Sequence, residues 1–169
     1  YLFCLWRVVI MKKIAIPITI LMVVLLFCLT GCNTNFKFKD LALSAENVTA
    51  VTINYGLDNK ETSKTEKIDK ILEELNNLDI EKCSEKIADN VFNDSVVGKV
   101  TMQVKDSKGK IGTFEMIFVE TAVNGERVSL VKCDTLDGFK IKKLTKGIYK
   151  MSSLTDTNAL LIKLFANCI

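Results

Sequence analysis

Residues 99–133 determine the architecture of this chain, and they read KVTMQVKDSKGKIGTFEMIFVETAVNGERVSLVKC. Apolar and polar residues alternate over residues 100–104, which is typical of a strand with one buried face. Residues 106–110 are polar and contain a glycine, so they predict a turn. Asn124-Gly125 is a strong hairpin signal because both residues tolerate positive φ. Strands joined by such short turns are antiparallel.

The segment from Ile111 to Glu120 differs from its neighbours because both of its faces are apolar. Phe114 and Phe118 lie on one face, together with the methionine between them, whereas Ile117 and Val119 lie on the other. A strand that is apolar on both faces has to be buried on both faces. We therefore predict that this segment is a central strand, covered on each side.

Further strands are predicted on both sides of this segment. They comprise residues 47–55, 78–83, 126–133, 139–144 and 148–151. Residues 84–98 are predicted to form a loop or a weak helix. This loop is rich in side-chain oxygen atoms, but it lacks the regular D-x-D-x-D-G spacing of a calcium-binding loop.

Two helices are predicted, at residues 63–76 and 152–169. Ser63 and Glu66 fit a capping box at the start of the first helix, and Ser153 or Thr155 is the expected cap of the second. The apolar stripe of the first helix comprises Ile68, Ile71, Leu72, Leu75 and Leu78. That of the second comprises Leu160, Leu161, Leu164 and Phe165, widened by Ala159 and Ile162. Stripes of this kind pack against a core.

Together these elements predict an α+β fold. The expected architecture is an antiparallel sheet of about five to six strands with two main helices, plus an N-terminal signal helix. We assign residues 1–10 to an upstream extension, 11–31 to a signal peptide, 32–46 to a tether and 47–169 to a single α+β domain. Phe36 and Phe38, in the tether, are expected either at a bilayer interface or at the start of a strand.

The segment Met11–Cys32, MKKIAIPITILMVVLLFCLTGC, indicates where the protein resides. Lys12 and Lys13 precede an apolar run over residues 14–29, and small residues follow, as in a secretory signal peptide. The final Leu29-Thr30-Gly31-Cys32 resembles the lipobox of bacterial lipoprotein precursors. The resemblance implies cleavage between Gly31 and Cys32 and attachment of a diacylglycerol to the Cys32 thiol. The alternatives are an uncleaved transmembrane anchor, although the run is short for one, and a cytosolic core helix.

Two further stretches resemble small lipoproteins of low-GC Gram-positive bacteria. These stretches are TINYG at residues 52–56 and EKIDKILEELNNL at residues 66–78. This second resemblance implies no activity and no site residues. Because positive residues stay on the cytoplasmic side, we expect everything after Cys32 at the extracytoplasmic face of a cell membrane, held there by lipid.

Composition excludes several classes of function. Of the 23 lysine and arginine residues, Arg7, Lys12 and Lys13 precede Cys32, which leaves 20 against 20 acidic residues. A formally neutral domain does not favour nucleic acid as a partner. The chain contains no histidine, so Ser-His-Asp and Cys-His catalytic sites and histidine-ligated zinc are impossible.

Three cysteines follow the anchor, namely Cys83, Cys133 and Cys168. No C-x-x-C motif occurs, so neither a zinc knuckle nor a thioredoxin-type site is indicated. We expect buried thiols that behave as small apolar residues. One disulfide is the alternative, because the predicted compartment permits it.

Five lysines and no acidic residue lie between Phe139 and Met151: Lys140, Lys142, Lys143, Lys146 and Lys150. One interpretation is contact with anionic lipid or an anionic wall polymer. The other is a solvated strand, since lysines commonly protect sheet edges.

No dinucleotide-binding or P-loop glycine pattern occurs, and we expect no catalytic residues, no cofactor and no metal. The sequence favours a membrane-anchored binding or interaction module of unknown ligand, with an envelope protein or an anionic polymer as partner. The alternatives are a structural or stress-related envelope accessory protein and a hydrolase without histidine.

Overall fold

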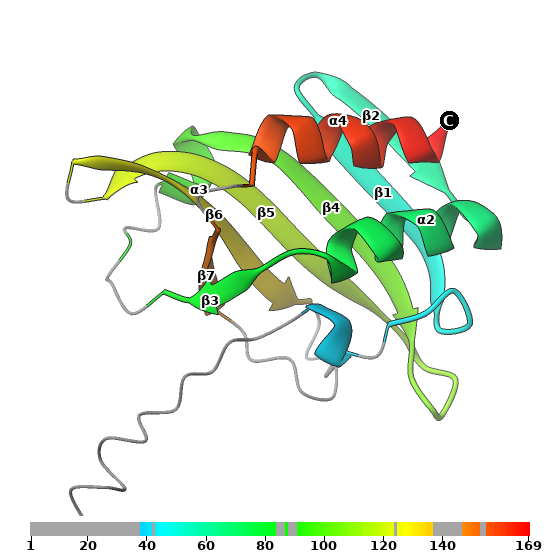
Figure 1. Ribbon diagram of the computed structural model, residues 1–169. Helices are drawn as coiled ribbons and strands as arrows, with labels where there is room; N and C mark the ends of the chain where they lie inside the picture. The colour runs from blue at the N-terminus through cyan, green and yellow to red at the C-terminus, as the bar shows by residue number, and fades with distance from the viewer. Residues whose placement is uncertain are drawn as a thin grey trace, which may run out of the picture. The chain divides into compact units, whose positions relative to one another are not determined.

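The computed structural model of the chain describes residues 38–41, 43–83, 87, 91–123, 125–136, 147–152 and 155–169. All of them belong to one compact unit, residues 35–169. Its elements are shown in Figure 1. In chain order they are η1 (Phe38–Leu41), β1 (Val48–Tyr55), β2 (Asp58–Thr62), α2 (Thr65–Asn76), β3 (Ile80–Lys82), α3 (Val91–Asp94), β4 (Val96–Lys105), β5 (Ile111–Val123), β6 (Glu126–Thr135), β7 (Gly147–Met151) and α4 (Thr157–Cys168).

The described strands form one sheet in the order β2-β1-β4-β5-β6-β7-β3, and every neighbouring pair is antiparallel. The predicted α+β class and antiparallel sheet are confirmed. The described part of the chain holds seven strands rather than five to six. The additional strand is β2, which pairs with β1 across a two-residue loop, Gly56-Leu57. The strand predicted at residues 139–144 lies outside the described residues, as does the signal helix.

β5 is the fourth of the seven described strands, and both of its faces are covered, as predicted. Helices α2 and α4 lie side by side over one face of the sheet (Figure 1). On that face Phe114, Met116 and Phe118 belong to the main core. On the opposite face Val119 belongs to a smaller cluster with Phe92 of α3 and two residues of β6. This second cluster is the reason for the apolar residues on both faces of β5.

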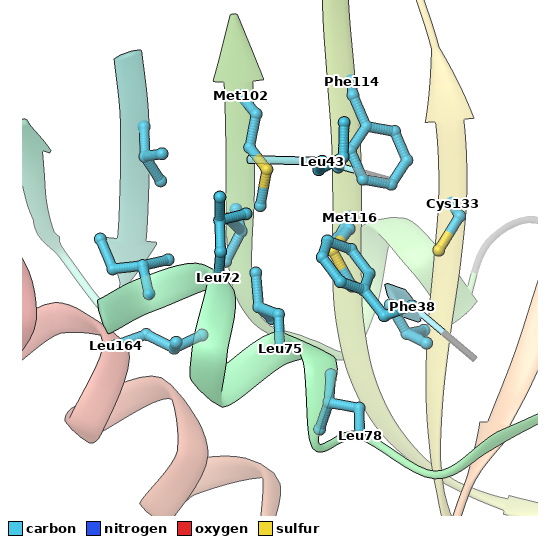
Figure 2. Packing of buried hydrophobic residues seen from close by; sticks show 14 of the residues in the cluster. Phe38, Leu43, Leu72, Leu75, Leu78, Met102, Phe114, Met116, Cys133 and Leu164 are labelled. Atoms are coloured by element: carbon cyan, nitrogen blue, oxygen red, sulfur yellow. The ribbon is translucent and has the colours of Figure 1, made fainter. Parts of the chain in front are cut away.

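The main core lies between the sheet and the two helices, as Figure 2 shows for Leu72 and Leu75 of α2 and Leu164 of α4. The predicted stripes of both helices are confirmed in their central residues. Ala159 and Ile162, in contrast, do not widen the buried side of α4. Both are exposed, and Ile162 retains 53% of its surface in water.

Both predicted helix caps are wrong. Lys64 occupies the cap position of α2 and no side chain caps that helix, so Ser63 does not form a capping box. α4 begins later than predicted, and its cap is Asp156 rather than Ser153 or Thr155. The Asp156 carboxylate accepts a hydrogen bond of 3.1 Å from the Ala159 N–H group.

The segment assigned to the tether contributes to the core. Phe38 is completely buried in η1, and its ring lies 6.2 Å from that of Phe114. Leu41 and Leu43 are buried too. Phe38 is therefore neither at a bilayer interface nor in a strand, and the packed structure extends to six residues after Cys32.

Candidate functional site

A pocket of about 240 Å³ lies where β6 extends beyond the end of β7. The last pair of residues between these strands is Leu130 with Lys150, so residues 126–129 have no partner on β7. The chain after β7 then borders the hollow. The lining residues are Glu126, Arg127, Val128, Ser129, Lys150, Met151, Ser152 and Thr155.

Backbone hydrogen bonds shape the far side of the pocket. The Ser152 N–H group donates to the Asp79 carbonyl at 3.0 Å, which holds the end of β7 beside β3. The Thr155 N–H group donates to the Ser152 carbonyl at 2.9 Å, which turns the chain toward α4. The Asp156 cap then starts the helix. These contacts place three hydroxyl-bearing residues, Ser129, Ser152 and Thr155, around one hollow.

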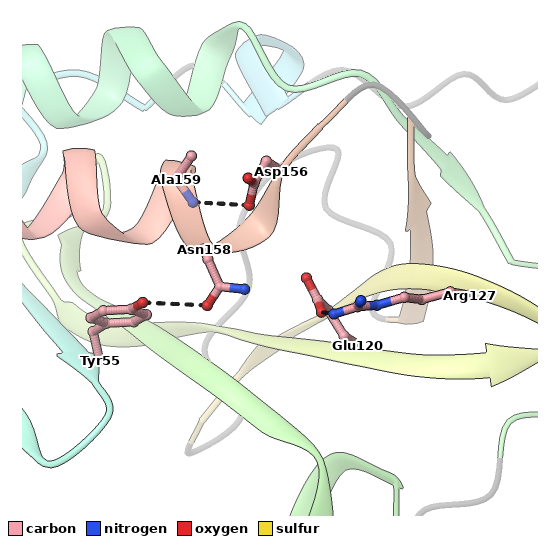
Figure 3. Close-up of polar contacts among 6 residues, drawn as sticks. All are labelled: Tyr55, Glu120, Arg127, Asp156, Asn158 and Ala159. Atoms are coloured by element: carbon pink, nitrogen blue, oxygen red, sulfur yellow. Dashed lines mark hydrogen bonds and ion pairs between the residues drawn. The ribbon is translucent and has the colours of Figure 1, made fainter.

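Figure 3 shows the polar contacts near the start of α4. The Tyr55 hydroxyl of β1 donates to the side-chain oxygen of Asn158 at 3.3 Å. Arg127 of β6 pairs with Glu120 of β5. The Arg127 side chain is 80% exposed, so its cation faces solvent at the mouth of the pocket. An exposed pair of this kind contributes little to stability.

Two cationic side chains line the pocket, Arg127 and Lys150. Arg127 pairs with Glu120, whereas Lys150 forms no ion pair with any described residue. Lys150 lines the same hollow as three hydroxyl-bearing residues, and ammonium and hydroxyl groups can both bind small anionic or strongly polar groups. The volume falls below the range of about 300 to 1,000 Å³ that is usual for small-molecule sites. The geometry therefore favours one small polar group over an enclosed substrate.

The buried thiol and phenol nearest to this region are poor nucleophiles. Burial, assisted by the charge of Asp134, raises the pKa of Cys133 to about 12. Burial, assisted by Cys133, raises the pKa of Tyr149 to about 12 as well. Both groups stay protonated at neutral pH, whereas nucleophilic cysteines act as thiolates. Cys133 and Cys168 are buried thiols, as the sequence favoured, whereas Cys83 is only half-buried.

Of the residues predicted to contact an anionic surface, Lys150 lies in the pocket. Lys140, Lys142, Lys143 and Lys146 lie outside the described residues, and so do Gly31 and Cys32. The other pocket residues were not predicted. Arg127 and Ser129 of β6 line one hollow with Thr155 because β6 extends beyond β7 and because Thr155 is held by its hydrogen bond to Ser152. No local pattern in the sequence encodes this arrangement.

The described ranges contain no group of three or more histidine, cysteine, aspartate or glutamate side chains that could hold a metal ion. None of the described helices has the length and apolar character needed to cross a membrane. Comparisons with protein-family models, curated proteins and solved structures gave no match to this chain.

Proposed function

We propose that this protein is a lipoprotein anchored through Cys32 to the extracytoplasmic face of a cell membrane, and that its α+β domain is a non-catalytic interaction module. The observation that carries the proposal is the segment from Met11 to Cys32. It combines a basic start, an apolar run and a Leu-Thr-Gly-Cys ending, the three parts that a lipidated export signal requires.

The position of Phe38 supports the proposal that the domain stays close to the lipid anchor. Five residues separate Cys32 from Phe38, which is completely buried in the core. Six peptide units span no more than about 20 Å when fully extended. A lipid on Cys32 would therefore keep the domain within reach of the bilayer surface and of components attached to it.

The partner we propose is an envelope protein or an anionic polymer, and the lysines from Lys140 to Lys150 would make the contact. Lys150 supports this role because it lines a pocket with three hydroxyl-bearing residues and has no ion pair within the described chain. Anionic groups such as phosphates suit a site of this chemistry.

The anchor is tested by labelling cells with an alkyne-tagged fatty acid. We expect the intact chain to incorporate the label and to fractionate with membranes. Cys32→Ala should lose the label because the acceptor sulfur is absent. Cys28→Ala is the matched control, since it removes a thiol four residues earlier, within the apolar run, and should keep the label. Equal labelling of the Cys32→Ala variant and the intact chain would refute the proposal.

A further inference from the structure

The end of the sheet at the β4–β5 turn combines exposed apolar and cationic side chains. Ile111 is 55% exposed and Leu136 is 41% exposed. Lys105, Lys108 and Lys110 are also exposed. We call these five residues the turn surface. Single exposed aliphatic residues are ordinary in soluble proteins, whereas Ile111 and Leu136 lie close to three lysines.

The strand register brings the turn surface together. Lys105 of β4 and Ile111 of β5 are directly paired. The Leu136 N–H group, just after β6, donates to the Thr113 carbonyl of β5 at 2.9 Å. Val104 and Phe114 are buried on the helix-covered face, so by alternation Lys105 and Ile111 lie on the other face. Residues from three strands thus meet at one corner of the sheet.

The lysines of the turn keep their charges available. The Asp106 carboxylate accepts hydrogen bonds from the backbone N–H groups of Lys108 and Lys110, at 2.8 and 2.9 Å. That carboxylate is held inside the turn, whereas Lys105, Lys108 and Lys110 have no ion pair within the described chain. Three exposed lysines without an ion pair among the described residues therefore lie on the same turn and strand ends as two exposed aliphatic side chains.

Phe38, the first described residue after Cys32, packs against the end of β5 that leads to the turn surface, although on the helix-covered face. Phe38 packs on Phe114, three residues along β5 from Ile111, or about 10 Å. The β1–β2 hairpin, with Leu57 at its tip, lies at the opposite end of the strands, because Tyr55 pairs with Gly98 at the start of β4. Because Phe38 is separated from Cys32 by no more than about 20 Å of extended chain, the end of β5 that carries Ile111 is within reach of a bilayer that holds a lipid on Cys32.

We propose that the turn surface rests on the anionic headgroups of the bilayer to which Cys32 is tied. Ile111 and Leu136 enter the interface, and the three lysines contact lipid phosphates. The inference rests on the proposed function, because the lipid on Cys32 supplies the proximity. Apolar side chains flanked by lysines are the composition that binds an anionic interface.

Tryptophan scanning tests this surface directly. Trp6 is the one tryptophan of the chain and precedes the proposed cleavage site, so an introduced indole is unique in the mature acylated protein. Mature acylated protein carrying Ile111→Trp is reconstituted into vesicles of phosphatidylcholine with phosphatidylglycerol. Leu57→Trp is the matched control, since Leu57 is fully exposed at the other end of the sheet. We expect a blue-shifted emission and quenching by brominated lipid for Ile111→Trp alone.

A charge variant extends the test. Replacing Lys105, Lys108 and Lys110 by glutamine should reduce the quenching of the Ile111→Trp protein several-fold. Replacing Lys60, Lys64 and Lys70, which are exposed elsewhere on the domain, should leave it unchanged. Vesicles of phosphatidylcholine alone should reproduce the effect of the first triple variant, because they carry no net negative charge.

Each contrary outcome has a separate meaning. Protein that floats with the vesicles but shows equal quenching at positions 57 and 111 overturns the turn surface alone. Protein that does not float overturns the lipid anchor and the turn surface with it. An emission shift that grows with protein concentration in detergent, without vesicles, assigns the turn surface to a second copy of the chain and overturns the proposal.

Discussion

At the scale of single residues, Gly98 shows how closely the layers of this domain approach. A Cβ atom at this position would lie 2.7 Å from Leu161 Cδ1 of α4 and 2.8 Å from the Asn54 carbonyl oxygen of β1. The leucine side chain can move, but the carbonyl belongs to the backbone of a paired strand. Glycine is therefore required here by a close approach between elements.

Gly98→Ala should lower the free energy of unfolding by about 1 to 3 kcal/mol, the usual cost of overpacking a core. Urea denaturation followed by circular dichroism measures it. Gly147→Ala is the control, because the nearest atom to its added Cβ would be Lys82 Cε at 3.9 Å. Equal stability of the two variants would show that β4 and α4 are not in close contact.

Because of Cys133, the free energy of unfolding of the domain depends on pH above about pH 9. Its pKa is about 12 in the folded chain, against an ordinary value of 9.0. Between these values the unfolded chain loses the thiol proton while the folded chain keeps it. The folded state then binds more protons, so the stability that Cys133 contributes is complete below pH 9 and is lost as pH rises toward 12.

We expect the free energy of unfolding to fall more steeply above pH 9 in the wild type than in Cys133→Ala, by up to about 1.4 kcal/mol per pH unit. Urea titrations at several pH values give both slopes. Val131→Ala also removes a completely buried side chain from β6, but it removes no titratable group. It should keep the wild-type slope, and a Cys133→Ala slope as steep as the wild type would contradict this role.

At the scale of elements, both helices begin at a different residue from the one that the local sequence pattern predicts. Ser63 and Glu66 have the right spacing for a capping box, yet Lys64 occupies the cap of α2. α4 begins at Asp156, and the sequence offered several polar residues in a row without favouring this one. Local spacing identifies that a helix starts, whereas the packing of the first turn decides at which residue.

The caps give a direct stability comparison. Asp156→Ala should cost about 1 kcal/mol, because the carboxylate accepts the Ala159 N–H hydrogen bond. Ser63→Ala should be neutral within experimental error, since Ser63 is exposed and caps nothing. Thermal unfolding of both variants measures the difference. Destabilisation by Ser63→Ala alone would support the capping box and contradict the structure.

Strands were predictable in proportion to their apolar content. β4 alternates strictly over its buried residues. β5 alternates as far as Phe118 and also buries Val119, and the apolar residues on both of its faces indicated its central position. β2, with the sequence DNKET, buries only Thr62, so no alternation marked it. It is a strand because its backbone completes hydrogen bonds along the edge of β1. Edge strands of this kind are set by the neighbouring strand rather than by their own side chains.

At the scale of the whole molecule, the fold class and the anchor segment could be inferred from the sequence, whereas the pocket is known only from the structure. The fold class was predictable because apolar periodicity extends through most of the domain. The pocket was not predictable, because it depends on the register between β6 and β7 and on the backbone hydrogen bonds of Ser152 and Thr155. The anchor segment that we propose could be inferred from sequence alone, since a lipidation signal requires composition and order rather than tertiary contacts.

The five lysines from Lys140 to Lys150 provide a whole-molecule prediction. Replacing all five by glutamine should weaken co-sedimentation of the protein with anionic envelope polymer by tenfold or more, at about 1 kcal/mol for each lysine close to the surface. Replacing five other lysines, Lys60 of β2, Lys64 at the cap of α2, Lys67 and Lys70 of α2 and Lys163 of α4, is the control for net charge. Unchanged binding of the first variant would show that these five lysines do not make the contact.

The most direct test of the central claim is intact-mass spectrometry of the protein purified from the membrane fraction. The account predicts a chain that begins at Cys32 and carries the added mass of a diacylglyceryl group. A chain that retains Met11, or one recovered from the cytosol with an unmodified Cys32, would contradict it.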